Sequence, residues 1–306
     1  MHREDPPPAP LRWAGLLLDR PRVMGILNVT PDSFSDGGRH ADPARAIAAG
    51  LAMAEAGADI VDIGGESTRP GAPAVPAAEE QARILPVIRA LAAAGIRLSV
   101  DTRNAATMAA ALDAGAAIIN DVSALAHDPA APWLLAARGA PVVLMHMRGT
   151  PATMMAHAQY TDPVAEVAAE LAASRDRALA AGIAPEAIAL DPGIGFAKRL
   201  EHNLALLRGL ERIAALGCPV LVGLSRKRFI GTIAGQADPA GRLAGSLAAG
   251  LFARAHGAHI LRVHDVPETI AALKLWTALD VPATLVDPSL AEHGIVPVSA
   301  PPPDAA

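Results

Sequence analysis

Polar and charged side chains stand at the ends of eight short apolar runs in this sequence of 306 residues. Near-continuous Val, Ile and Leu runs of this length are typical of strands that are buried on both faces of a parallel sheet. The groups that end the runs are Asn28; Asp62 with Glu66, Ser67, Thr68 and Arg69; Asp101; Asn120 and Asp121; His146; Asp191; Ser225, Arg226 and Lys227; and Arg262, His264 and Asp265. Each of them alone could be a helix cap, a satisfied histidine or a solvated loop cation. Because all eight runs end in this way, the set indicates a binding or catalytic site.

Three of these side chains, Asp101, Asn120 and Asp191, predict a pocket that is rich in hydrogen-bond acceptors. Two carboxylates and an amide suit a flat heterocycle with several N–H donors and a carbonyl, since a carboxylate matches a guanidine-like edge with two parallel bonds. Cations at other run ends predict a rim for phosphate or carboxylate groups, and they are Arg69, Lys227, Arg262 and His264. The expected ligand is therefore a heterocycle with a phosphorylated arm.

Composition and missing motifs exclude several other classes of protein. The sequence has no H-E-x-x-H, no G-x-S-x-G and no Walker loop, which disfavours a zinc hydrolase or an acyl-enzyme. A net charge of -5 with both signs spread along the chain, and only 3% aromatic residues, argue against a nucleic-acid partner. The single cysteine, Cys218, excludes an internal disulfide framework and a Cys-based zinc cluster.

No membrane partner is expected either. No segment approaches the roughly 20 uninterrupted apolar residues of a membrane span. The N-terminus carries acids and prolines where a signal peptide would need a basic start and an apolar stretch. We therefore expect a cytoplasmic protein with small-molecule substrates.

The elements that would position the polar groups alternate along the chain. Expected strands cover 23–29, 59–64, 96–102, 116–121, 140–146, 187–193, 219–225 and 259–265. Helix-like stretches cover 42–57, 76–94, 104–114, 129–138, 162–181, 200–216, 239–256 and 266–279. Eight strand–helix units predict an α/β fold, a closed (β/α)8 TIM barrel whose reactive groups lie where the strands end. A doubly wound open sheet fits less well, because no strand opens onto a complete G-x-G-x-x-G turn.

The organisation predicted is a single barrel domain with two flanking segments. An N-terminal extension would cover 1–21, the barrel 22–282, and a Pro/Ala-rich tail 283–306. No linker-like stretch interrupts the interior, so a second domain is not expected.

Eight segments, in order along the chain, resemble the dihydropteroate synthases of folate biosynthesis, a pterin-binding TIM-barrel family. They are ILNVTPDSFSDGG, DIGGESTRPGA, VDT, IND, LMHMRG, DPGIGF, GLSRKRFIG and GSLAAGLFARAHGAHILRVHDV, and the resemblance covers roughly residues 22–280. That family joins 6-hydroxymethyl-7,8-dihydropterin diphosphate to 4-aminobenzoate, with release of pyrophosphate. The resemblance implies a dissociative reaction: diphosphate leaves while Mg²⁺ and cations hold its charge, and the arylamine then attacks. The protein would contribute positioning and charge stabilisation.

The resemblance also implies a role for each matching residue. The pterin would be bound by Asp101, Asn120, Met145, Asp191 and Lys227. The 4-aminobenzoate would be bound by Thr68, Arg69, Pro70, Phe196 and Ser225. The diphosphate would be bound by Asn28, Arg262 and His264, with Asn28 also holding Mg²⁺. The catalytic residues would be Asp101, Lys227, Arg262 and His264.

Two loops deserve separate expectations under this resemblance. The loop after the first strand would be a lid with Gly37 and Gly38 as its hinge, and the lid residues are Asp32, Ser33 and Phe34. In DPGIGF-Ala197-Lys198, alanine stands where the family usually has glycine. If that position needs a positive φ, the loop that holds Phe196 could shift. Lys198 itself could be only a solvated loop cation.

Two other functions remain as alternatives. A barrel of the methyltetrahydrofolate:corrinoid methyltransferase type would share the aspartate–asparagine pocket, but it would not need the SRK and RVH cations or the long first loop. A catalytically silent pterin-binding protein would predict damage at key positions, and none is seen. Members of the resembled family are usually homodimers. The apolar faces of LAAGLFARA and IAALKLWTAL could supply such an interface, or could simply pack on the barrel.

Overall fold

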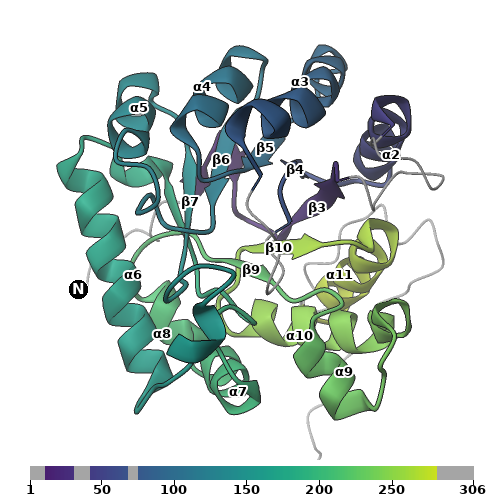
Figure 1. The fold of residues 1–306 in the computed structure, drawn as a ribbon. Coiled ribbons are helices and arrows are strands. Elements are labelled where there is room, and N and C mark those ends of the chain that lie inside the picture. Colours follow the sequence, from purple (N-terminus) through teal and green to yellow (C-terminus); the bar gives the residue numbers. More distant parts are fainter. Residues whose placement is uncertain (1–10, 31–41, 68–74, 281–306) are drawn as a thin grey trace, which may run out of the picture.

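The computed structural model describes residues 11–30, 42–67 and 75–280. Within them, eight parallel strands form a barrel and the helices form a ring around it (Figure 1). The strands are β3 (Arg22–Asn28), β4 (Ile60–Gly64), β5 (Leu98–Asp101), β6 (Ile118–Asp121), β7 (Val142–Met145), β8 (Ile188–Asp191), β9 (Leu221–Gly223) and β10 (Ile260–Val263). Each lies on a predicted run. The predicted TIM barrel is therefore confirmed.

The strand order shows how the barrel closes. Hydrogen bonding runs β8-β7-β6-β5-β4-β3-β10-β9, so β3 pairs with both β4 and β10. The remaining gap between β8 and β9 is bridged where Leu190 pairs with Val220, and the Leu190 N–H donates to the Pro219 carbonyl at 2.8 Å. All eight strands consequently end at one face, which we call the mouth.

The helices cover the outside of the strands and bury the main apolar core between the two layers. They are α2 (Pro43–Glu55), α3 (Ala77–Ala93), α4 (Ala105–Asp113), α5 (Ala131–Arg138), α6 (Pro163–Ala180), α7 (Leu200–Arg208), α8 (Leu210–Ala214), α9 (Arg228–Ala234), α10 (Leu243–Ala255) and α11 (Val266–Asp280). The start of α6 is fixed locally, because the Asp162 carboxylate accepts from the N–H groups of Val164 and Ala165, and Pro163 suits the first helical position. None of the helices in the described segments is long and apolar enough to cross a bilayer.

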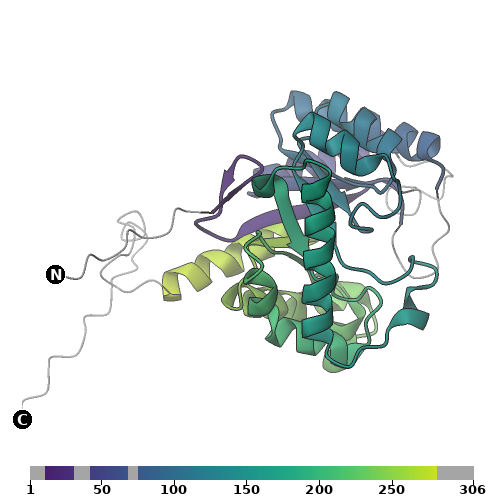
Figure 2. The same cartoon turned by 90° about the vertical axis from the view of Figure 1, so that its left-hand side faces the viewer.

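A short N-terminal hairpin closes the end of the barrel opposite to the mouth. It consists of β1 (Arg12–Trp13) and β2 (Leu16–Leu17), which pair antiparallel. Trp13 is 1% exposed, lies in a cluster with inward residues of seven barrel strands, and donates its indole N–H to the Ala187 carbonyl at 3.0 Å. Figure 2 shows this purple hairpin at the far end from the teal loop that follows β7. The hairpin thus plugs the base of the barrel.

Two predicted helices differ from those observed. The predicted helix over 200–216 is divided into α7 and α8 at Gly209, where a Cβ would lie 2.7 Å from the Val164 side chain of α6. The close approach of α6 explains why glycine stands at this break. The predicted helix over 239–256 begins as a 3₁₀ turn, η3 (Pro239–Arg242), before α10, and the short helix α9 was not predicted.

Candidate active site

The polar residues of the mouth occupy one layer of the barrel interior. Side chains two residues apart on a strand share a face. Asp62 lies two residues beyond buried Ile60, and Arg262 lies two beyond buried Ile260. The same step places Asn120, Met145 and Asp191 above buried apolar residues of their own strands. The inward apolar residues fill the barrel below the polar ones. The polar side chains that follow them therefore face the interior of the barrel at its mouth.

A buried ion cluster stands at the centre of this layer. The Arg262 Nε donates to Asp62 Oδ2 at 2.6 Å, and its Nη2 donates to Asp101 Oδ2 at 3.0 Å. The Asn120 amide nitrogen also donates to Asp62 Oδ2, at 3.0 Å. The amide oxygen of Asn120 is therefore left as an acceptor for a ligand. Four strands, β4, β5, β6 and β10, are joined by these bonds.

Asp62 is a site residue to which the sequence analysis gave no role. It is fully buried, and its Oδ1 atom has no hydrogen-bond partner among the described residues. Its other oxygen orients both Arg262 and Asn120. The sequence signal was present, because a carboxylate inside an otherwise apolar strand is costly to bury without partners.

The charge of Asp101 is sensitive to its surroundings. Burial raises the pKa of Asp101 to about 7, Arg262 opposes that rise, and the nearby carboxylates of Asp62 and Asp121 add to it. The Asp101 carboxyl can therefore gain or lose its proton near neutral pH. A ligand that donates N–H groups to it would favour the ionised form.

Asp191, Lys227 and Phe196 meet on the other side of the mouth. The Asp191 carboxylate accepts from the Gly193 N–H at 2.7 Å, and burial raises the pKa of Asp191 while Lys227 lowers it. Lys227 donates to the carbonyl of Ile194 and lies 4.8 Å from the centre of the Phe196 ring. Burial lowers the pKa of Lys227 to about 8, and Asp191 opposes that fall.

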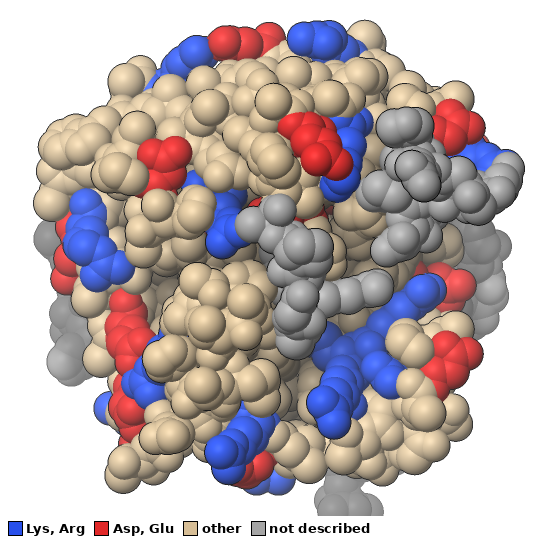
Figure 3. Space-filling view, in the orientation of Figure 1, with Lys and Arg blue, Asp and Glu red and all other residues tan. Residues whose placement is uncertain are grey.

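Ser225 and His264 form a further pair at the ends of β9 and β10. The Ser225 hydroxyl lies 3.1 Å from His264 Nδ1 and accepts from the His264 backbone N–H at 3.2 Å. This contact brings together one residue predicted for 4-aminobenzoate and one predicted for the diphosphate. Basic side chains gather on this face beside α9 (Figure 3), where the chain reads Arg226-Lys227-Arg228.

Asn28 ends β3 close to Asp101, a member of the buried ion cluster. A Cβ added at Gly64 would lie 3.6 Å from Asn28 Oδ1 and 3.6 Å from the Asp101 Cβ, so glycine leaves space between those two side chains. No group of three His, Cys, Asp or Glu side chains that could hold a metal occurs in the described segments. Mg²⁺ usually binds through one or two protein oxygens, several waters and substrate phosphates. The amide oxygen of Asn28 fits that kind of site.

Three polar residues near the mouth are hydrogen-bonded to partners within the protein. The carboxylate of Asp121 accepts from the backbone N–H groups of Ser123 and Leu125, so it shapes a turn. His146 is 4% exposed, and its Nδ1 and Nε2 atoms are paired with Lys198 and Glu170. The interpretation of Lys198 as a solvated loop cation is wrong: the residue is only 3% exposed, because His146 and the Phe196 carbonyl surround its ammonium group.

Ala197 does have a positive φ, the backbone conformation that favours glycine at this position. Its φ is +49°, and the residue is completely buried. Several predicted residues cannot be placed, since they lie outside the described residues. They are Thr68, Arg69 and Pro70 of the predicted aminobenzoate site, and Asp32, Ser33 and Phe34 of the predicted lid with its hinge at Gly37 and Gly38.

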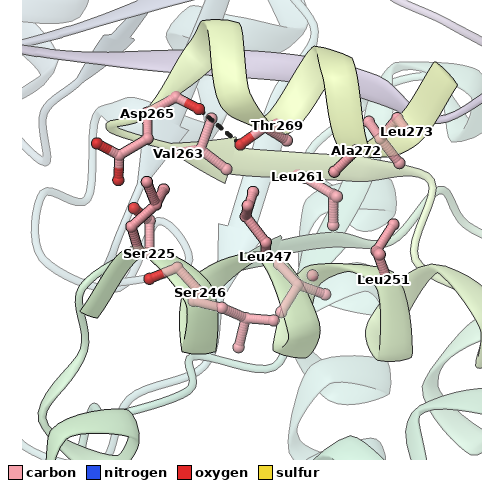
Figure 4. Close-up of a pocket in the computed structure, with 14 residues that line it drawn as sticks. Ser225, Ser246, Leu247, Leu251, Leu261, Val263, Asp265, Thr269, Ala272 and Leu273 are labelled. Atoms are coloured by element: carbon pink, nitrogen blue, oxygen red, sulfur yellow. Dashed lines mark hydrogen bonds between the residues drawn. The ribbon is translucent and has the colours of Figure 1, made fainter. Parts of the chain in front are cut away.

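A separate apolar pocket lies between α10 and α11, behind β9 and β10. Figure 4 shows Leu247, Leu251, Leu261 and Leu273 directed into it, with Ser225 and Ser246 at one end. It contains no cluster of charges that could bind a phosphorylated heterocycle. The polar layer of the mouth is the better candidate for the active site.

Comparisons with known proteins show which family the chain resembles in sequence and in structure. Residues 24–264 match the family described as "Pterin binding enzyme". The chain is 49% identical over 269 residues to the dihydropteroate synthase of Neisseria meningitidis serogroup B, covering 86% of this chain and 94% of that protein. It is similar to the structure of Xanthomonas albilineans dihydropteroate synthase with 4-aminobenzoic acid, with a TM-score of 0.83, 52% identity, and coverage of 88% and 97%. The Xanthomonas enzyme in complex with 7,8-dihydropteroate gives a TM-score of 0.80, 50% identity, and coverage of 87% and 97%.

Proposed function

Because this chain belongs to the family of pterin-binding enzymes, we propose that it is a dihydropteroate synthase. It would condense 6-hydroxymethyl-7,8-dihydropterin diphosphate with 4-aminobenzoate to give 7,8-dihydropteroate and pyrophosphate. The observation that carries the proposal is the mouth layer, where the acceptors Asp101, Asn120 and Asp191 meet the cations Lys227 and Arg262. The corrinoid methyltransferase alternative has no diphosphate to expel, so it leaves these cations without a use.

The acceptor groups would bind and orient the pterin. The oxygen of Asn120 and the carboxylates of Asp101 and Asp191 can accept from the N–H groups along one edge of the ring system. Met145, 2% exposed on the same interior layer, offers an apolar surface for the ring. Binding in this pocket replaces water with fixed groups, which strengthens each electrostatic interaction.

The bond to diphosphate would break before the new bond forms. The C–O electron pair leaves with the diphosphate, and positive charge develops on the pterin methylene and ring. Ionised Asp101 would stabilise that charge. Arg262 and His264 bind the departing anion, and Mg²⁺, held by Asn28 and the diphosphate, would neutralise part of its charge.

The arylamine would then attack the cation. Phe196 and Ser225 would be the described members of the 4-aminobenzoate site, and Lys227, 4.8 Å from the centre of the Phe196 ring, would lie between the two substrates. The amine lone pair forms the C–N bond, and the nitrogen then loses a proton that pyrophosphate can accept. Holding both substrates in line supplies much of the rate enhancement, because no covalent enzyme intermediate is needed.

The test is product formation from the two substrates, followed by chromatography and a pyrophosphate assay. We expect dihydropteroate and pyrophosphate in equal amounts, and a loss of both when a chelator removes Mg²⁺. Absence of dihydropteroate would refute the activity. The order of bond changes needs a second measurement. The oxygen that joins the pterin methylene to the diphosphate is labelled with ¹⁸O, and the substrate is incubated with the protein without 4-aminobenzoate. If the C–O bond breaks reversibly, the label should move from this bridging position to the non-bridging oxygens of the same phosphate. Retention of the label in the bridge would count against dissociation.

We further propose that the protein acts as a homodimer in the cytoplasm. Large apolar side chains are exposed on neighbouring helices α10 and α11: Phe252 is 40% exposed, Leu275 63% and Leu279 76%. Apolar area of this kind is typical of association surfaces. The single cysteine, Cys218, is free and buried, as suits a reducing compartment.

A further inference from the structure

The loop between β8 and α7 adopts a left-handed backbone at every second residue, and one of these residues is not glycine. Gly193, Gly195 and Ala197 have φ values of +66°, +84° and +49°. Left-handed backbone is costly for alanine, so it persists only where surrounding contacts hold it. A Cβ at Gly193 would fall 2.0 Å from the His146 carbonyl oxygen, so the loop lies directly against the end of β7.

Lys198 supplies the contacts that hold this loop. Its ammonium nitrogen lies 2.9 Å from His146 Nδ1, 2.9 Å from the Phe196 carbonyl and 3.3 Å from the His146 carbonyl. An ammonium group has three N–H donors, and here three acceptors from two segments match them. The loop is thereby tied to the end of β7 by the hydrogen bonds of one buried side chain.

The network continues outward to helix α6. Since Nδ1 of His146 accepts from Lys198, its Nε2 carries the hydrogen and donates to Glu170 at 2.9 Å. Arg148 holds the other oxygen of Glu170 at 3.0 Å. The chain Glu170–His146–Lys198 therefore fixes the ring orientation of the histidine and the position of the lysine.

Charged groups of both signs influence Lys198. Burial lowers the pKa of Lys198 to about 7; the negative charges of Asp191 and Glu170 oppose that fall, and the cations Lys227 and Arg148 add to it. The mechanism above uses none of the Lys198–His146–Glu170 chain. Burying the ionisable groups of this chain costs free energy, and direct contact with either substrate does not explain why the protein bears that cost.

Phe196 connects this network to the reaction. Lys198 holds the carbonyl of Phe196, while Lys227 lies over its ring and donates to Ile194 two residues earlier. We propose that Lys198 is a positioning residue that sets the affinity for 4-aminobenzoate by holding Phe196 in place, with His146 and Glu170 as its support. This inference rests on the proposed function, because it takes Phe196 as part of the aminobenzoate site.

The test compares two lysine-to-methionine variants, Lys198→Met and Lys274→Met, by steady-state kinetics with each substrate varied in turn. Lys274 is exposed on α11 and serves as the matched control. In Lys198→Met, the KM for 4-aminobenzoate should rise about tenfold, equivalent to about 1.4 kcal/mol, while the KM for the pterin substrate stays within about twofold. Equal effects on both substrates would overturn the inference.

A double-mutant cycle checks that Lys198 acts through Phe196. In a Phe196→Ala background, Lys198→Met should raise the KM for 4-aminobenzoate by less than about twofold, because the side chain being positioned is gone. An unreduced, additive effect would show that Lys198 acts elsewhere, and would overturn the inference.

Glu170→Gln provides a second variant if Lys198→Met does not fold. The Glu170 side chain is 41% exposed, so the change keeps its volume at a tolerant position. We expect the KM for 4-aminobenzoate to rise about threefold with the pterin KM unchanged, and an unchanged aminobenzoate KM would contradict the network. A wild-type protein that forms no dihydropteroate would instead refute the proposed function. Normal wild-type turnover with unaffected variants would refute this inference alone.

Discussion

Asp101 and Lys227 both titrate near neutral pH, and for the same physical reason. Burial disfavours the charged form of each, so the pKa of Asp101 is raised to about 7 and that of Lys227 is lowered to about 8. In the proposed reaction each has a task that needs its charge: Asp101 would stabilise a cation, and Lys227 would contact both substrates. Both side chains are therefore mainly ionised only between about pH 7 and about pH 8.

We predict a bell-shaped pH profile of kcat/KM for the pterin substrate. Below about pH 7 Asp101 becomes protonated and can no longer stabilise a cation. Above about pH 8 Lys227 loses its proton and its positive charge. The value of kcat/KM should therefore fall by up to about tenfold per pH unit on either side of this range. Initial rates from pH 5 to 10 measure the profile, with those limits chosen to span both values.

The variant Lys227→Arg identifies the alkaline limb. Arginine keeps its charge throughout this range, so the residual activity of the variant should no longer fall above about pH 8. An alkaline limb that is unchanged in Lys227→Arg would assign it to another group.

Residue type and position along the strands were enough to predict part of the candidate site, whereas the other part depends on which side chains are buried and which partners they meet. Asp101, Asn120 and Asp191 were recognisable because acceptors at the ends of apolar strands must face the barrel mouth. The burial of Lys198 could not be predicted, because the sequence does not show whether a long side chain folds inward and its partner His146 is 52 positions away. The part that Asp62 plays could not be predicted, because it orients Arg262 and Asn120, and the sequence does not show that these three side chains meet.

At the scale of elements, hydrophobic pattern predicted the barrel strands and most helix positions. The pattern failed where a neighbouring element sets the boundary, as at Gly209, where the Val164 side chain packs against the break between α7 and α8. It also failed for α9, a helix of 7 residues that is too short for a periodic signal. The hairpin β1–β2, with only 2 residues in each strand, gave no pattern either.

We predict that the hairpin stabilises the fold without taking part in the reaction. Trp13→Ala should lower the free energy of unfolding by about 3–5 kcal/mol, because the indole fills the base of the barrel and donates to Ala187. Trp133 is 65% exposed on α5, so Trp133→Ala should change that free energy by less than about 0.5 kcal/mol.

Urea unfolding followed by circular dichroism measures the stability of both tryptophan variants. The folded Trp13→Ala protein should keep its KM values, because the hairpin and the mouth lie at opposite ends of the barrel (Figure 2). Equal destabilisation by the two variants would mean that Trp13 is not a plug.

At the scale of the whole molecule, charge and apolar area are placed on different surfaces. Basic side chains gather on the mouth face (Figure 3), which suits two anionic substrates, while the exposed apolar side chains of Phe252, Leu275 and Leu279 belong to α10 and α11. Association through α10 and α11 would therefore leave the reaction within each subunit.

The proposed homodimer leads to a test with a matched control. Wild-type protein should show a mass near twice the chain mass of 31.2 kDa in size-exclusion chromatography with light scattering. Leu275→Glu should give monomers, because a charge placed in an apolar interface loses its hydration without gaining a partner. Trp133→Glu puts the same charge on α5, away from α10 and α11 in Figure 1, and should leave the dimer intact. A monomeric wild type at micromolar concentration would contradict the dimer, whereas dissociation caused only by Trp133→Glu would move the interface to α5.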